Sequence, residues 1–273
     1  MRLQDKVALV TGGGRGIGRA IALAYAKEGA DLVVLAPRSD DIRATAEAVE
    51  ALGRRALYLT ADVACWDQVS GAVEDALAAF GRIDVLVNNA GVHGPIGPLA
   101  ANDPARWLEA VMVNLGGTFT CCKAVLTHMM SRRQGKIVNL SGGGAVSVRP
   151  NFSAYSSSKA AVVRLTECLA EEVRPYNIQV NAISPGGVHT YLTEEVLAAG
   201  ELAGEEALLE ARRIIETRAS PGRAASLAVF LASDASGGLS GRLISALWDD
   251  WRTMPDRMDE IMASNRYTVR RVA

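Results

Sequence analysis

The chain has 273 residues, of which 49% are hydrophobic and 22% are charged, and its formal net charge at pH 7 is -1. This length suits one α/β domain, and the near-zero charge gives no electrostatic reason to expect nucleic acid or an anionic membrane as a partner. No uninterrupted apolar run reaches the roughly 18 residues that span a bilayer, and the first apolar run meets glycines too early for a signal peptide, so we expect a cytoplasmic protein.

The cysteines and histidines do not indicate a metal site. Four cysteines are present, none of them in a C-x-x-C pair, and the three histidines are scattered along the chain. We therefore expect no metal and no disulfide framework, with the cysteines as small buried residues in a reducing compartment.

Short β-branched runs alternate with helical patterns. Strands are predicted at 6–12, 31–36, 55–62, 84–91, 135–144, 178–186 and 241–247, and helices at 17–29, 40–53, 67–81, about 107–130, and around residue 155. Continuous apolar strands that alternate with helices predict a mostly parallel seven-stranded sheet covered on both faces. The expected fold is α/β and doubly wound (Rossmann-type), with one domain over 1–250 and a tail over 251–273.

A glycine-rich turn follows the first predicted strand. In "TGGGRGIG", Gly12, Gly16 and Gly18 are spaced G-x-x-x-G-x-G. Such glycines let the backbone approach a pyrophosphate at the start of a helix, although a plain flexible turn would have the same composition. The position directly after a buried strand favours nucleotide binding.

The end of the second predicted strand bears on the choice of dinucleotide. No carboxylate stands at its tip, and Arg38, together with Arg15 of the glycine turn, could clamp a ribose 2′-phosphate. Asp40 or Asp41 could instead fold back to a free 2′-hydroxyl, which would favour NAD. We expect NADP(H) to be favoured over NAD(H).

Six motifs in order make the chain resemble the short-chain dehydrogenase/reductase family. They are the glycine turn 11–18, the segment "ADV" with Asp62 and Val63, "NNAG" at 88–91, Asn114, the pair Tyr155 and Lys159 in "YSSSK", and "PGGVHT" at 185–190. The resemblance implies an NAD(P)-dependent oxidoreductase that interconverts a secondary alcohol and a ketone. It also implies a set of cofactor-binding residues: Gly12, Arg15, Gly16, Ile17, Gly18, Arg38, Asp62, Val63, Asn89, Ala90, Gly91, Tyr155, Lys159, Pro185, Gly186, Val188 and Thr190.

The tyrosine and lysine lie four residues apart and share one face of their predicted helix. A phenol titrates near pH ~10, but a neighbouring ammonium and the positive nicotinamide of the oxidised cofactor favour the phenolate. Tyr155 can then exchange a proton with the substrate as hydride moves. By the resemblance, Lys159 also binds the nicotinamide ribose, and Asn114 holds a water that links the lysine to solvent. The alternative is an ordinary exposed pair on a helix.

The chain departs from the family pattern at its third catalytic residue. The family has a serine thirteen positions before the tyrosine, and here that position is Gly142. Ser141 is our expected substitute, because three consecutive glycines leave the loop free to move; Ser147 is a more distant candidate. Absence of the hydroxyl would instead leave the substrate to make its own polar contacts, or would indicate a non-catalytic, cofactor-sensing or scaffold protein.

The remaining expectations concern the substrate and the assembly. The segment 189–218 corresponds to the family's substrate lid, with Gly200 and Gly204 as possible hinges. Residues 248–251, "WDDW", replace a glycine turn and are read either as pocket lining or as packing. The family resemblance implies a homotetramer or homodimer, and the tail 251–273 could then lie at a subunit interface. The expected substrate is a small-molecule alcohol or ketone. A 3-oxoacyl thioester, a sugar or cyclitol, and a polyketide ketone all stay open.

Overall fold

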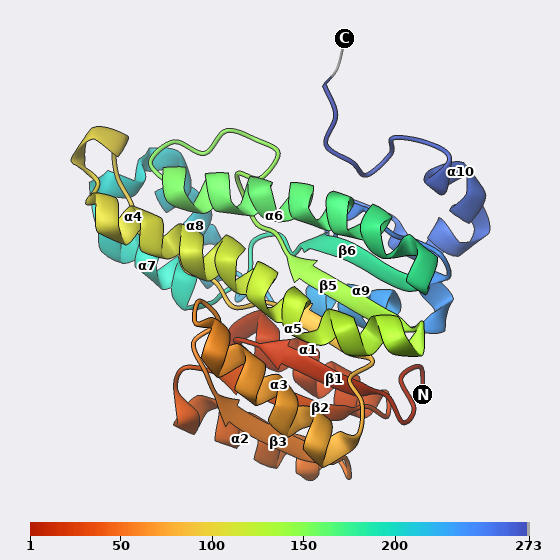
Figure 1. The fold of residues 1–273 in the computed structure, drawn as a ribbon. Coiled ribbons are helices and arrows are strands. Elements are labelled where there is room, and N and C mark those ends of the chain that lie inside the picture. Colours follow the sequence, from red (N-terminus) through yellow and green to blue (C-terminus); the bar gives the residue numbers. More distant parts are fainter. Residues whose placement is uncertain (272–273) are drawn as a thin grey trace.

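A parallel sheet of seven strands forms the centre of the computed structural model, which describes residues 1–271 (Figure 1). The strands are β1 (Val7–Thr11), β2 (Asp31–Ala36), β3 (Ala56–Thr60), β4 (Val85–Asn88), β5 (Gly135–Leu140), β6 (Ile178–Ser184) and β7 (Leu243–Ser245). Their order is β3-β2-β1-β4-β5-β6-β7, and all neighbours pair in parallel. This confirms the predicted doubly wound α/β fold.

Helices cover both faces of the sheet (Figure 1). One face carries α1 (Gly16–Lys27), α2 (Ser39–Glu50) and α9 (Gly222–Ala232), and the other carries α3 (Trp66–Phe80), α5 (Gly117–Arg132) and α6 (Ser153–Val173). The remaining α-helices are α4 (Pro104–Val111), α7 (Tyr191–Ala199), α8 (Glu205–Glu216) and α10 (Met258–Met262). Short 3₁₀ segments are η1 (Leu99–Ala101), η3 (Arg174–Tyr176), η4 (Gly200–Ala203), η5 (Asp234–Ser236) and η6 (Trp251–Arg257).

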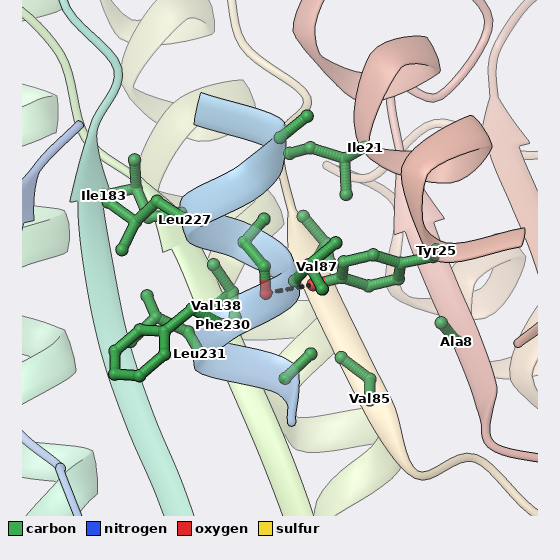
Figure 2. Packing of buried hydrophobic residues seen from close by; sticks show 14 of the residues in the cluster. Ala8, Ile21, Tyr25, Val85, Val87, Val138, Ile183, Leu227, Phe230 and Leu231 are labelled. Carbon is green, nitrogen blue, oxygen red and sulfur yellow. Dashed lines mark hydrogen bonds between the residues drawn. The ribbon is translucent and has the colours of Figure 1, made fainter. Parts of the chain in front are cut away.

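The central strands β1, β2 and β4 carry uninterrupted apolar runs because both of their faces are buried. All five residues of β1 are buried, as are all four of β4. Figure 2 shows the packing between α9 and the sheet, where Tyr25 of α1 lies among aliphatic side chains and donates a hydrogen bond to the carbonyl of Ala228 at 3.0 Å. Burying a side chain of this size contributes about 1.5–3 kcal/mol, and the hydrogen bond satisfies its hydroxyl inside the core.

The long helix predicted at about 107–130 is divided into two α-helices. A π-helical turn, η2 (Met112–Gly116), lies between α4 and α5, and it contains Asn114. By length and composition alone, the helical stretch from 104 to 132 could cross a membrane. In the structure, however, Cys121, Val125 and Met129 are buried against the sheet as part of the core.

The chain returns to its own domain after β7. The amide of Leu243 donates to the carbonyl of Tyr267 at 2.8 Å. The buried guanidinium of Arg242 donates to the carbonyls of Ile261, Met262 and Ser264 at 3.1–3.3 Å. The tail is therefore held on the edge of the sheet as far as it is described.

The two tryptophans of the "WDDW" segment differ in burial. Trp251 is buried against Phe230 of α9, with ring centroids 5.5 Å apart. Asp249 accepts a hydrogen bond from the amide of Ser245 at 2.7 Å, whereas Trp248 is exposed. One tryptophan thus belongs to the core, and the first carboxylate closes the turn after β7.

Candidate active site

The glycine turn between β1 and α1 leaves its backbone bare. Gly12 and Gly16 have positive φ angles of 61° and 55°, which glycine adopts without strain. A Cβ on Gly18 would overlap the carbonyl of Gly12. The helix α1 can therefore pack this closely against the turn only because residue 18 is glycine. The side-chain Nδ2 of Asn89 donates to the carbonyls of Thr11 and Gly12 at 3.0 and 3.1 Å and so fixes the turn.

This turn fits the pyrophosphate of a dinucleotide. Side chains on Gly13 and Gly14 would come within 2.6 Å of Val34 and Asp41, so nothing can project from these positions. The first amides of α1 face outward at the amino end of the helix, where an anion is stabilised by free N–H groups and the helix dipole. Arg15, directly before α1, is exposed and adds a positive charge.

The predicted adenosine-side residues follow β2 and β3. Arg38 is exposed and makes no ion pair within residues 1–271. Asp40 lies in the first turn of α2 and pairs with Arg43 at 3.3 Å, so it does not occupy the strand tip. Asp62 accepts a hydrogen bond from the amide of Ala64 at 2.9 Å, which shapes the turn after β3.

The "NNAG" segment joins the glycine turn to the tyrosine helix. The amide of Ala90 donates to the hydroxyl of Thr11 at 3.1 Å. A Cβ on Gly91 would lie 3.0 Å from Oδ1 of Asn114 and 3.3 Å from Nζ of Lys159. Three motifs that are distant in the sequence, "NNAG", Asn114 and "YSSSK", therefore meet beside the glycine turn.

The segment after β6 lies on the same side. Gly16 is close to Thr190, whose Cγ2 would be 3.2 Å from a Cβ on that glycine. Gly186 has a positive φ of 77°, and Val188 is buried. The remaining predicted cofactor residues, Ile17, Val63 and Pro185, lie in α1, after β3 and after β6 respectively. The predicted cofactor residues thus gather along the carboxyl end of the sheet, where doubly wound folds bind their ligands.

Tyr155, Lys159 and Asn114 form the polar centre of the site, and all three are buried. Lys159 Nζ donates to the carbonyl of Leu140 at 2.8 Å and lies 5.8 Å from the centroid of the Tyr155 ring. Asn114 Oδ1 accepts from the amide of Val92, and its Nδ2 donates to the carbonyl of Val92 and to the hydroxyl of Ser158, each at 2.9 Å. The π-helical turn holds this asparagine against α6, the helix that carries the tyrosine and the lysine.

Burial dominates the titration of this pair in the protein alone. It raises the pKa of Tyr155 to about 12, partly opposed by the positive charge of Arg149. It lowers the pKa of Lys159 to about 8, because the dry surroundings disfavour the ammonium. The neutral phenol is therefore the resting form of Tyr155, and a further positive charge is needed to make it an efficient base at neutral pH.

The position of the missing serine is closed to a side chain. A Cβ on Gly142 would overlap the hydroxyl oxygen of Tyr155. Ser141, at the end of β5, is buried, and its Oγ has no hydrogen-bond partner within residues 1–271. Ser147 is exposed in the loop that follows. Of the two candidate serines, Ser141 is the one with a buried and uncommitted hydroxyl.

Two residues of this region are not part of any motif in the sequence. His93, two residues after "NNAG", is buried with its ring centroid 4.9 Å from that of Tyr155 and 5.4 Å from that of Phe152. The guanidinium of Arg149 lies 4.0 Å from the centroid of the Phe152 ring. The sequence signal for this packing is a histidine two residues after "NNAG". Its position alone does not predict which rings it contacts.

The segment of α7, η4 and α8, where the family resemblance implies a substrate lid, packs against the tyrosine. Val196, Ala203 and Ala211 of the lid pack in one cluster with Phe152 and Tyr155. Gly200 and Gly204 have positive φ angles of 56° and 84° at the ends of η4. They therefore stand where the chain turns between α7 and α8, and the hinge role expected for them stays a prediction.

Tyr191, the first residue of α7, connects the segment after β6 to the "NNAG" segment and to the glycine turn. The hydroxyl of Tyr191 donates to the carbonyl of Gly91 at 2.8 Å, and the guanidinium of Arg15 lies 3.8 Å from the centroid of its ring. Three strand-end loops are thereby linked on one side of the sheet.

Comparison with known proteins gives a consistent set of relatives. Residues 6–200 match the family model for short chain dehydrogenase. The chain is 37% identical over 248 residues to (2S)-[(R)-hydroxy(phenyl)methyl]succinyl-CoA dehydrogenase subunit BbsD of Thauera aromatica, covering 89% of this chain and 96% of that protein. It is 37% identical over 243 residues to cis-4-hydroxycyclohexanecarboxylate dehydrogenase of Sinomonas cyclohexanicum, covering 88% and 94%. A crystal structure of NAD⁺-bound xylitol dehydrogenase superposes with a TM-score of 0.84 at 30% identity, covering 90% and 98%.

Proposed function

The chain belongs to the short-chain dehydrogenase/reductase family and is an NAD(P)-dependent oxidoreductase acting on CH–OH groups, and from this premise we propose that it interconverts a secondary alcohol and a ketone with Tyr155 and Lys159 as its acid–base pair. The observation that carries the proposal is the convergence on one point of Tyr155, Lys159, Asn114 and the bare glycine turn. The nicotinamide cofactor supplies the hydride acceptor or donor and, when oxidised, a positive charge.

Tyr155 is proposed to move the proton. In alcohol oxidation its oxygen takes the hydroxyl proton as hydride leaves the same carbon, and in ketone reduction it returns that proton. The positive charge of Lys159 and of the oxidised ring favours the phenolate and offsets the effect of burial on the tyrosine pKa. The Asn114 contacts with Val92 and Ser158 keep the π-helical turn against α6, so that the lysine stays aligned.

Ser141 is proposed to contact the substrate oxygen in place of the missing serine. Its hydroxyl is buried at the end of β5 and has no partner in the described chain, whereas Gly142 has no room for a side chain. A substrate oxygen that reaches Tyr155 would give this hydroxyl the hydrogen bond that it lacks.

NADP(H) is proposed as the favoured cofactor. The tip of β2 offers the exposed and unpaired Arg38, and the nearest carboxylate on α2, Asp40, is engaged with Arg43. Arg15 adds a second positive charge at the glycine turn, although it also stacks on Tyr191. Guanidinium groups match the geometry of a 2′-phosphate.

The proposal is tested with a panel of alcohols and ketones in the presence of each cofactor. Cyclohexanol, xylitol, cis-4-hydroxycyclohexanecarboxylate and the corresponding ketones would be assayed by the absorbance of the reduced nicotinamide. Turnover of at least one pair that depends on Tyr155 supports the proposal. Turnover that is unaffected when Tyr155 becomes phenylalanine would overturn the assigned acid–base role.

A homo-oligomer is proposed from the outer face of α4, η2 and α5. Leu108, Met112 and Phe119 are each at least half exposed there. Leu108 and Met112 are four residues apart and share a helical face, and Phe119 lies in α5, beyond the π-helical turn. Two copies paired through this face would cover it. Phe119→Glu is expected to lower the molar mass measured by light scattering, and an unchanged mass would point to another interface.

The cytoplasm is proposed as the working compartment. All four cysteines, including the exposed Cys168, are free thiols, which is the usual state in a reducing environment. Fractionation of cells that express a tagged full-length chain would test this location.

A further inference from the structure

An unpaired guanidinium stands over the loop beside Tyr155. Arg149 is half-buried and stacks on Phe152 at 4.0 Å, and Phe152 itself is fully buried. Arg149 makes no hydrogen bond or ion pair with any residue of 1–271. The lid is rich in carboxylates, yet the one that reaches this site, Glu195, has its Oε2 3.3 Å from Nδ1 of His93 instead.

The triple-glycine loop places this guanidinium. A Cβ on Gly143 would lie 3.6 Å from Nη1 of Arg149, and a Cβ on Gly144 would lie 3.2 Å from its Cβ. Gly144 has a positive φ of 89°, so the chain turns back at this residue. The adjacent Gly142 touches the hydroxyl of Tyr155, and neighbouring Cα atoms are about 3.8 Å apart. The hydroxyl of Tyr155 and the guanidinium of Arg149 thus lie next to two consecutive glycines, Gly142 and Gly143, which have no side chains.

The same region contains buried polar atoms without partners. His93 is only 4% exposed, and its Nδ1 lies near Glu195 without the alignment of a hydrogen bond. Burial lowers the pKa of His93, so its ring is neutral and can accept or donate one hydrogen bond. The ring lies between those of Tyr155 and Phe152. Buried polar atoms normally find partners, so Nδ1 of His93 is free to bind a polar atom of a ligand.

We propose that Arg149 binds a carboxylate of the substrate, so that the compound oxidised at Tyr155 is a small hydroxy acid and the product an oxo acid. A guanidinium fixed by an aromatic face can bind a carboxylate through two parallel hydrogen bonds. His93 would face the body of the substrate between the two ends. The inference rests on the proposed alcohol–ketone function and assigns its substrate class.

The first test compares matched acids and esters that differ in charge. The ratio of kcat/KM for cis-4-hydroxycyclohexanecarboxylate over its methyl ester would be measured for the wild type, Arg149→Gln and Arg149→Lys. A wild-type preference for the acid that falls at least about tenfold in Arg149→Gln, and less in Arg149→Lys, is the expected result. Because the ratio cancels any common change in proton transfer, it reports on recognition of the charge alone.

The second test measures binding without turnover. Calorimetry of the protein loaded with oxidised cofactor would compare cyclohexanecarboxylate with cyclohexanecarboxamide. The acid is expected to bind more tightly than the amide, and about tenfold more weakly in Arg149→Gln than in the wild type. Arg55→Gln is the matched control, because the guanidinium of Arg55 also stacks on an aromatic ring, 4.4 Å from the Phe80 centroid. Arg55 directly precedes the outer strand β3. This variant should leave unchanged both the acid-to-ester ratio of kcat/KM and the acid-to-amide ratio of affinities.

The outcomes separate the two proposals. Equal binding of acid and amide by the wild type, or a ratio that survives Arg149→Gln, would overturn the assignment of Arg149. Neutral alcohols that are still oxidised in a Tyr155-dependent way would then leave the proposed function standing. Oxidation that persists in Tyr155→Phe would instead remove the proposed function itself.

Discussion

The hydroxyl oxygen of Tyr155 occupies the volume that a side chain on residue 142 would need, and that residue is Gly142. The departure from the family pattern at this position therefore has a steric consequence. A serine introduced here would have to displace the tyrosine, and the phenol is packed under the lid with Phe152 and Val196.

Restoring the family residue is expected to harm the enzyme. Gly142→Ser should lower kcat about tenfold or more, since small displacements of a catalytic group are costly, and it should lower the melting temperature because the loop is overpacked. Gly71→Ser in α3 is the control, as a Cβ there meets nothing within 4 Å. An increase in kcat for Gly142→Ser would mean that the loop moves to make room for the side chain and that the wild type lacks a hydroxyl that assists catalysis.

Tyr155→Phe tests the proton carrier. We expect kcat to fall by about 10²–10⁴ with little change in melting temperature, because the phenol oxygen makes no hydrogen bond within residues 1–271. Cofactor binding, measured by fluorescence titration, should persist. Tyr58→Phe, on the half-exposed edge strand β3, is the control and should retain turnover.

Asn114→Ala should destabilise the fold. The change removes one acceptor and two donors that hold the amide and carbonyl of Val92 and the hydroxyl of Ser158. Leaving buried polar groups without partners costs about 1–3 kcal/mol each, so the free energy of unfolding in urea should fall by roughly 3 kcal/mol. The exposed Asn265 offers a control substitution, Asn265→Ala, for which no comparable loss is expected.

Lys159→Met should give a stability difference that depends on pH. Burial lowers the folded pKa of Lys159 to about 8 from 10.5, so between these values the unfolded chain binds more protons than the folded one. Wild-type stability then rises with pH across this window. Relative to the wild type, the methionine variant should gain most near pH 7, by on the order of 3 kcal/mol at most, and the gain should shrink between pH 8 and 10.5.

Denaturation curves of the two proteins at several pH values would check this. Lys27→Met, at the exposed end of α1, provides the comparison and should show no such trend. A gain that is constant with pH would mean that Lys159 is not held against its charged form.

Arg38→Gln should reduce the preference for NADP(H). The guanidinium is free at the tip of β2, so its loss should raise KM for NADPH about tenfold and leave KM for NADH nearly unchanged. Arg43→Gln removes a guanidinium that is already paired with Asp40 and should alter neither value. A wild-type protein that prefers NADH would contradict the proposed clamp.

The sequence predicted the sheet because its signals are local. All seven strands lie where the sequence predicts them, since each is rich in apolar, mostly β-branched or leucine residues, as in Val7–Thr11. The glycine turn could be predicted equally well, because only glycine suits its φ angles and close contacts. Motif residues such as Asn114 could be placed beside Lys159 by resemblance, but their distances could not.

Features that depend on tertiary contacts were not visible in the sequence. The π-helical turn at 112–116 interrupts what reads as one helix, and it is stabilised by Asn114 bonding to Val92. The packing of His93 and Arg149 around Phe152 joins the loop after β4 to the loop between β5 and α6, and it has no local pattern. The overlap between Gly142 and Tyr155 likewise arises only when β5 and α6 are brought together.

The bond from Leu243 to the carbonyl of Tyr267 has a consequence for how molecules can associate. A border strand with unused amides is a template onto which another chain can add by β-augmentation. Here the returning polypeptide occupies that border, and the guanidinium of Arg242 anchors it. Growth of a continuous intermolecular sheet at the β7 rim is thereby obstructed, so β3 is the edge of the sheet that stays open to such an addition.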